Sequence, residues 1–241
     1  MAYRDDSDLE FLKKCSSEDL DILVSILTTD KDGTARLTED LTINERFKKY
    51  APDHNKYWDL VAAEVQGFGG NTFATMFRGG KGVLYKEVLT DACDKMNVNY
   101  NSNSTVEMIE MNLLMKILTD SMDKMTPEQL QEIVKDLDLK TTNFSKEAVI
   151  IALQTAVRLG GFASYQVALI VANAIAKAMV GRGLALAANA GLTRTIGVFA
   201  GPIGWALTAL WTAIDMAGPA YRVTIPSVVQ IAFLRTKQKQ L

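Results

Sequence analysis

The fold of this chain depends on the stretch LGGFASYQVALIVANAIA, Leu159 to Ala176, in which all 18 residues are uncharged. A second uncharged run of 20 residues, TIGVFAGPIGWALTALWTAI, extends from Thr195 to Ile214. Because an α-helix rises about 1.5 Å per residue, helices of these lengths span roughly 27–30 Å, close to the hydrocarbon thickness of a bilayer. The two runs therefore predict either a helical hairpin that enters a membrane or one that is buried in a soluble core.

The membrane interpretation draws on small and aromatic residues within the two runs. Gly197 and Gly201 put two small residues on one helix face, where a second helix can approach closely. Trp205 and Trp211 are of a type that favours the membrane–water interface. The residues predicted to form the membrane-competent segment are Leu159, Phe162, Val167, Ile170, Ala176, Gly197, Gly201, Trp205, Trp211 and Ile214.

Other features favour a hairpin buried in a core. Ala, Gly, Thr, Asn and Gln make both runs only weakly apolar, and small residues permit tight helix packing. If both runs crossed a membrane from the cytosol, the loop 177–194, which has bases and no acid, would be translocated against the positive-inside tendency. Glycine breaks at Gly160–Gly161 and Gly181–Gly183 divide this half into pieces. The sequence thus favours a hairpin that is sheltered at rest and can enter a membrane when released, rather than a fixed two-pass anchor.

Charge is distributed unevenly along the chain. The formal charge is -2 overall, but residues 148–241 contain one acid and eight bases, so this part is +7 and residues 1–147 are -9. The basic flank of the apolar runs consists of Arg182, Arg194, Arg222, Arg235, Lys237 and Lys239. Such a split predicts that the basic half meets anionic lipid or the acidic half itself. Nucleic acid is not predicted, since the bases are scattered.

The predicted fold class is all-α. Residues 1–140 show helical spacing of apolar residues and no period-2 strand, which indicates an acidic, multi-helix N-terminal domain. Residues 145–241 are predicted to form a basic, Ala/Gly-rich helical hairpin domain. Helix starts are indicated at Ser16, Ser104, Thr126 and Ser145. Residues 220–225 precede a proline, so we expect them to be extended or in a turn.

No arrangement typical of catalysis, cofactor binding or metal binding is visible. His54 is the one histidine, and its polar turn predicts a surface position. Thr28 replaces the first acid of a calcium loop, and no Ser or Thr follows Lys81 in the glycine-rich segment, so neither motif is complete. We therefore expect a protein that is not an enzyme and has no cofactor or metal.

Two features predict a cytoplasmic location. The cysteines, Cys15 and Cys93, form no disulfide framework and are expected to be reduced and buried. The N-terminal sequence MAYRDDSDLEF is acidic and has no apolar run, so it does not predict a secretory signal. Any membrane contact, peripheral or inserted, is therefore expected at the cytoplasmic face of the inner membrane.

Three segments resemble bacterial YaaW-type proteins, a family without assigned function. They are YRDDSDLEFLKKCSSEDLDILVSILT (3–28), FGGNTFATMFRGG with LYKEVLTDACDKM (68–80 and 84–96), and GPAYRVTIPSVVQIAFLR (218–235). The family is distantly grouped with ubiquinol–cytochrome c chaperones, which are helical assembly factors. The resemblance implies an all-α fold and supplies no active-site residues.

Two functions follow from these observations. The first is a non-enzymatic helical protein that acts at the bacterial inner membrane by association, insertion or pore formation. The alternative is a soluble chaperone or adaptor whose apolar hairpin is buried in its own core or in a partner interface. The expected partners are anionic membrane lipid, a partner protein or a second copy of the chain.

Overall fold

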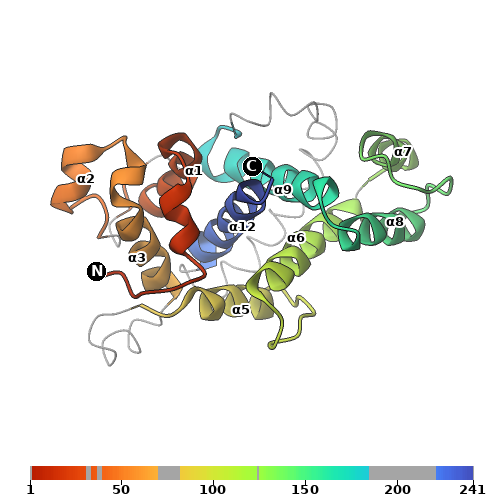
Figure 1. The fold of residues 1–241 in the computed structure, drawn as a ribbon. Coiled ribbons are helices and arrows are strands. Elements are labelled where there is room, and N and C mark those ends of the chain that lie inside the picture. The colour runs from red at the N-terminus through yellow and green to blue at the C-terminus, as the bar shows by residue number, and fades with distance from the viewer. Residues whose placement is uncertain are drawn as a thin grey trace.

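The computed structural model describes residues 2–30, 34–36, 40–69, 82–123, 125–184 and 221–240. These residues fold into helices joined by loops, which confirms the all-α prediction (Figure 1). The elements are η1 (Glu10–Lys14), α1 (Ser17–Thr28), α2 (Glu45–Tyr50), η2 (His54–Tyr57), α3 (Trp58–Gly69), α5 (Tyr85–Lys95), α6 (Val106–Met122), α7 (Pro127–Asp136), α8 (Lys146–Arg158), α9 (Phe162–Val180) and α12 (Tyr221–Gln238).

Several helices begin where the sequence predicts. The hydroxyls of Ser16 and Ser145 each accept a hydrogen bond from the backbone amide three residues later. Thr126 and Gln129 form a capping box, in which each side chain accepts a hydrogen bond from the other residue's backbone amide. These bonds satisfy amides that a helix start leaves unpaired. The start of α6 is shifted, because its N-cap is Thr105, one residue later than predicted.

Glycines set both ends of α9, as the sequence predicts. Gly160 and Gly161 precede the helix with φ angles of 78° and 70°, and Gly181 ends it in the left-handed conformation with φ of 76°. L-residues with a side chain rarely adopt these angles, whereas glycine adopts them without steric cost. The backbone can therefore turn sharply between α8 and α9.

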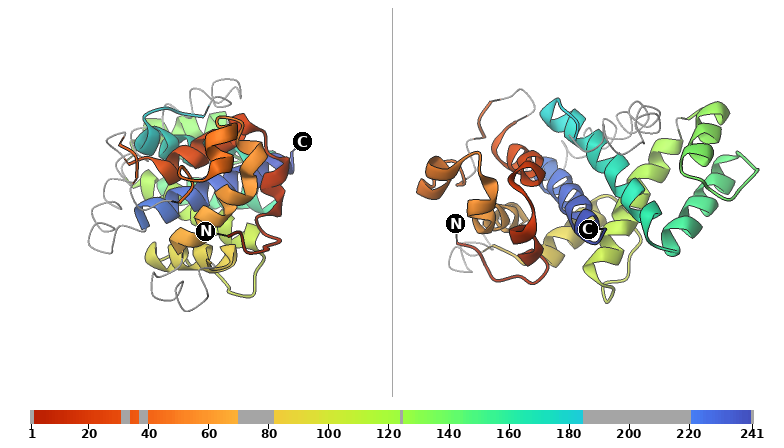
Figure 2. Two further views of the ribbon diagram at one scale, coloured as in Figure 1. Left: turned by 90° about the vertical axis from the view of Figure 1, so that its left-hand side faces the viewer. Right: turned by 45° about the horizontal axis from the view of Figure 1, so that its top comes forward.

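Helix α12 lies at the centre of the molecule. It packs against α9 and is also in contact with α1, α3, α5 and α6 (Figures 1 and 2). One buried cluster includes Leu23, Leu113, Ile170 and Val229, which come from both predicted domains. The predicted boundary at 140–145 falls in the connection between α7 and α8. In the described part of the chain, the two predicted domains therefore share one hydrophobic core.

The expectation for the residues before Pro226 is wrong. Tyr221 to Ile225 are helical, and Pro226 lies inside α12. Proline costs this helix one backbone hydrogen bond. Val223 and Ile225 are buried in the core, and burying such side chains stabilises by about 1.5–3 kcal/mol each. Tertiary packing thus outweighs the local preference.

Helices α7 and α8 form an arm at one end of the molecule, opposite α2 (Figures 1 and 2). Ser145 caps α8, and Val149 and Leu153 are the buried side chains of that helix. Leu130, Ile133 and Val134 are buried on α7. Each of these helices thus packs on the rest of the molecule through a narrow apolar face. Other side chains of the arm remain at the surface, where they can contact another molecule.

Candidate functional site

The first uncharged run occupies two different environments. At its start, between α8 and α9, Leu159 is 85% exposed and Phe162 is 58% exposed. From Val167 to Ala176 every residue is buried, and α9 packs there on α12, α6 and α1. Among the described residues, α9 is the one helix long and apolar enough to cross a membrane, and 67% of its most apolar window is buried. A core helix of a soluble protein has the same properties.

The second uncharged run, 195–214, lies outside the described part of the chain. The predicted site residues that lie outside the described part of the chain are Gly197, Gly201, Trp205, Trp211, Ile214 and Arg194. The same holds for the segment with Lys81 and for part of the calcium-like loop. The membrane role of these residues stays a prediction.

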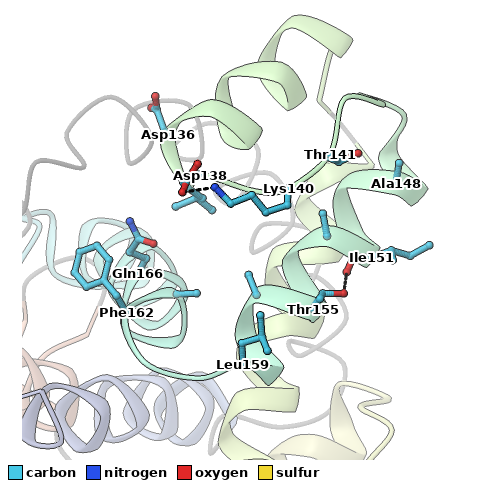
Figure 3. A pocket seen from close by; sticks show the side chains of 14 residues that line it. Asp136, Asp138, Lys140, Thr141, Ala148, Ile151, Thr155, Leu159, Phe162 and Gln166 are labelled. Carbon is cyan, nitrogen blue, oxygen red and sulfur yellow. Dashed lines mark hydrogen bonds and ion pairs between the residues drawn. The ribbon is translucent and has the colours of Figure 1, made fainter.

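A groove of about 730 Å³ lies between the arm and the start of α9 (Figure 3). Leu159 points into the space between α8 and α9, and Ile151 lies on the outer rim (Figure 3). The apolar lining residues are Leu137, Ala148, Ile151, Ala152, Ala156, Leu159, Phe162 and Ala163. Large apolar side chains that are exposed together are typical of a surface that binds another molecule.

Polar groups of this groove lie mainly along one edge. Asp136 is the last residue of α7 and Asp138 follows in the connection to α8, where it pairs with Lys140 at 2.6 Å (Figure 3). On α8, the hydroxyl of Thr155 donates to the carbonyl of Ile151 at 2.8 Å, so it is already satisfied. The described lining residues include no histidine or cysteine. The groove is therefore suited to binding an apolar surface rather than to nucleophilic or acid–base catalysis.

The basic flank lies against the acidic half of the chain. Four of its six members form ion pairs with acids from residues 1–147. The pairs are Arg182–Asp21, Arg235–Glu110, Lys237–Asp19 and Lys239–Glu107, with N–O distances of 2.5, 2.9, 2.5 and 3.2 Å. This is the second arrangement that the charge split allows, in which the basic half meets the acidic half itself. Contact of these side chains, or of Arg222, with lipid stays a prediction.

One of these pairs is buried and part of a hydrogen-bonded cluster. Arg235 Nε donates to Glu110 Oε2 at 2.9 Å, and Arg235 Nη2 donates to the carbonyl of Asp8 at 2.6 Å. Tyr85 Oη donates to Glu110 Oε1 at 2.7 Å, and the guanidinium lies 4.5 Å from the ring centre of Phe11. Burial raises the pKa of Glu110, against the lowering effect of the Arg235 charge. The cluster joins α5, α6 and α12 to the N-terminal segment.

The predicted surface position of His54 is wrong. The side chain is buried, its Nδ1 lies 2.5 Å from Tyr57 Oη, and its Nε2 lies 3.3 Å from Asp21 Oδ1. Polar partners for both ring nitrogens offset the cost of removing the imidazole from water. Tyr57 follows His54 by one helical turn, and this spacing is a signal for such a contact.

The cysteines are buried, as predicted. Burial raises the pKa of both Cys15 and Cys93 to about 12, so the reactive thiolate is disfavoured.

In the part of the chain that the structure describes, no group of three His, Cys, Asp or Glu side chains is arranged to hold a metal ion.

Sequence reasoning did not identify the groove. Its signal is the segment KEAVIIALQTAVR of α8, where Ile150 and Ile151 are adjacent and apolar residues extend around more of the helix than one core-facing stripe needs. Only Val149 and Leu153 of this helix are buried. An excess of apolar positions over buried ones marks a helix with a second apolar contact.

Comparison with known proteins points to one bacterial family. The model of the family "Ubiquinol-cytochrome C chaperone" matches residues 53–229, and that of a domain of unknown function, DUF3944, matches residues 3–37. A UPF0174 protein of Helicobacter pylori J99 is 48% identical over 241 residues, which is 100% of this chain and 95% of the relative. The UPF0174 protein YaaW of Escherichia coli K12 is 34% identical over 239 residues, 97% of this chain and 95% of the relative. No solved structure matches.

Proposed function

The chain belongs to the UPF0174 family, and we propose that it is a non-enzymatic, chaperone-like protein that binds an apolar helical segment of a partner protein. The observation that carries the proposal is the groove between the arm and α9, where Leu159 and Phe162, three positions apart in the chain, are both exposed. The name of the matching family model supports a chaperone-like role. This corresponds to the chaperone or adaptor alternative, with the binding surface at the start of the first uncharged run rather than along its whole length.

The residues that line the groove indicate the chemistry of a partner that would fit it. An amphipathic helix presents apolar side chains at i, i+3, i+4 and i+7, and such a stripe can pack against the apolar wall of α8 and the first turn of α9. Asp136 and Asp138 lie along one edge, so a lysine or arginine beside the stripe would be favoured there. We therefore propose that the occupant is an amphipathic helix with a basic flank.

The proposal can be tested with a designed peptide of Leu, Ala and Lys carrying a fluorophore. We expect the full-length protein to raise the anisotropy of this peptide in a saturable way. Leu159→Asp and Phe162→Asp should each weaken binding about tenfold or more, because a charge would replace an apolar contact.

Ile43→Asp provides the matched control. Ile43 is 65% exposed, as Leu159 and Phe162 are more than half exposed, but it does not line the groove. Equal loss of binding in all three variants, or no loss in any, would contradict the groove as the binding surface. If the wild-type protein instead self-associates and loses this in L159D, the occupant is a second copy of the chain.

Membrane association at the cytoplasmic face of the inner membrane is the second candidate function. The observation that favours it is the length and hydropathy of α9, whereas the burial of that helix against α12 disfavours it in the folded state. Insertion would require α9 to leave the core. Carbonate and detergent washes of cell membranes, with liposome leakage as a second readout, test this candidate. Full recovery of a monodisperse soluble species without leakage would exclude it.

A further inference from the structure

A second cavity, of about 750 Å³, lies between α6, the end of α8 and the end of α12. Its apolar lining includes Met108, Met111 and Leu114 of α6 and Val157 of α8. Met108 is 59% exposed, and methionine adapts its shape to different apolar ligands. The volume is in the range of cavities that hold small organic molecules. The apolar part of a ligand would lie on this wall.

Cationic groups line the same cavity. Arg158, Arg235 and Lys239 line it, together with two carboxylates, Glu107 and Glu110. Both carboxylates are already engaged, since Glu107 pairs with Lys239 and Glu110 pairs with Arg235. Arg158 makes no hydrogen bond or ion pair with any residue that the structure describes. The cavity thus has one cation more than it has anions.

Arg235 is held ready to bind an anion. Its Nε and Nη2 are fixed by Glu110 and by the carbonyl of Asp8, and its guanidinium lies over Phe11. Nη1 has no hydrogen bond to the described residues and is not among their fully buried unsatisfied atoms. A guanidinium fixed in this way loses little entropy when it binds a carboxylate.

The ion pair between Lys239 and Glu107 can be broken at a low cost in free energy. Both side chains are about half exposed, at 60% and 42%. Exposed pairs of this kind contribute little to stability. Lys239 can therefore turn from Glu107 to a bound anion without disturbing the fold.

From these contacts we infer that this cavity binds a small amphipathic carboxylate, a molecule with one anionic head and an apolar chain. The carboxylate lies between Arg158, Lys239 and Nη1 of Arg235, and the chain lies along Met108, Met111 and Leu114. The site is separate from the groove at the arm, and it does not depend on the proposed binding of a partner helix.

Calorimetric titration of the full-length protein with octanoate tests the inference. We expect saturable one-to-one binding, with much weaker binding of 1-octanol, which lacks the charge, and of acetate, which lacks the chain. Arg158→Ala and Met108→Asp should each weaken octanoate binding about tenfold, because they remove a charge-assisted contact or place a like charge on the apolar wall. Both side chains are exposed, so the variants should fold.

One variant is expected to bind octanoate more tightly than the wild-type protein. Glu110→Gln removes the carboxylate that competes for Arg235 but keeps a polar partner for Tyr85. The loss of the buried pair destabilises the fold, but the folded variant should bind octanoate about fivefold more tightly. Lys140→Ala, an exposed cation outside this cavity, serves as the control and should leave binding unchanged. No octanoate binding to the wild-type protein, or binding that neither R158A weakens nor E110Q strengthens, would overturn the inference.

Vesicles separate the two sources of an anionic amphiphile. Binding of free octanoate, lost in R158A, supports a site for a soluble carboxylate. Binding only to vesicles that contain an anionic phospholipid, with no response to free octanoate, would overturn the inference in favour of a lipid surface.

Discussion

The centre of the molecule and the arm use the same kind of sequence in opposite ways. In the centre, the middle of α9 is packed on α12 and completely buried, and ion pairs of Arg182 and Lys237 connect this part of the chain to α1. At the arm, the start of the same uncharged run exposes Leu159 and Phe162 at the edge of a groove. Two glycines with positive φ, Gly160 and Gly161, lie between these exposed side chains and turn the backbone from α8 into α9.

This comparison shows what length and hydropathy leave undetermined. An uncharged run of 18 residues is long enough for a membrane, but its environment depends on whether another helix covers it. Here α12 covers the middle of the run. At its start, Leu159 and Phe162 remain exposed in the part of the chain that the structure describes. The same kind of substitution, an apolar residue replaced by Asp, should therefore change the unfolding free energy very differently in the two regions.

The largest difference is expected between Ile170→Asp and Leu159→Asp. Ile170 is fully buried, so a carboxylate there should destabilise the protein by about 4 kcal/mol or more, whereas L159D should change the unfolding free energy by less than about 0.5 kcal/mol. Urea denaturation followed by circular dichroism measures both values. Similar stabilities for the two variants would mean that the run does not have two environments.

The buried cluster should give the next largest effect. Glu110→Ala leaves Arg235 buried without its carboxylate and should cost about 3–5 kcal/mol. Replacing both Glu110 and Arg235 by methionine should restore most of this loss, since no unpaired charge remains. The same denaturation experiment checks both. If the double variant is as unstable as E110A, the cost comes from lost packing rather than from an unpaired charge.

Alkaline pH should destabilise the core through its cysteines. Burial raises the pKa of Cys15 and Cys93 from 9.0 to about 12, so between these values the unfolded state releases protons that the folded state retains. This contribution is therefore complete below pH 9 and is lost as the pH rises toward 12. Urea denaturation at pH 8 and pH 10.5 should show a decrease that is smaller in a variant with both cysteines changed to alanine. An equal decrease in that variant would assign the effect to other groups.

The smallest effect is expected for an exposed ion pair. Lys239→Ala breaks the pair with Glu107 and should cost less than about 1 kcal/mol, with the difference falling further in 1 M salt. Thermal unfolding at low and high salt measures this. A loss comparable to that of E110A would show that Lys239 supports the core as well as the surface.

The sequence predicts the helical framework well because local chemistry determines it. Hydroxyl caps at Ser16, Thr126 and Ser145 and glycine breaks around α9 act within a few residues, and the structure contains them as expected. Burial of both cysteines was also predicted correctly. By contrast, the helical state of the residues before Pro226 depends on distant packing partners, which local preference does not reveal.

The candidate site was harder to predict because two surfaces must come together. The groove combines the end of α7, one side of α8 and the first turn of α9, and only its lining residues from Leu159 onward belong to the predicted run. The buried environment of His54 similarly requires Asp21 from a helix 33 positions earlier in the chain. The charge split did predict that the two halves could pair, but it did not specify which acid meets which base.

Cysteine labelling of α9 tests the central claim most directly, namely that the middle of α9 is core and its start belongs to a binding surface. In a background with Cys15→Ala and Cys93→Ala, Phe162→Cys should react rapidly with a maleimide, and Val167→Cys should be protected. Addition of the Leu/Ala/Lys peptide should protect position 162 and leave position 167 unchanged. Rapid labelling at both positions, or no protection of position 162 by saturating peptide, would contradict the account.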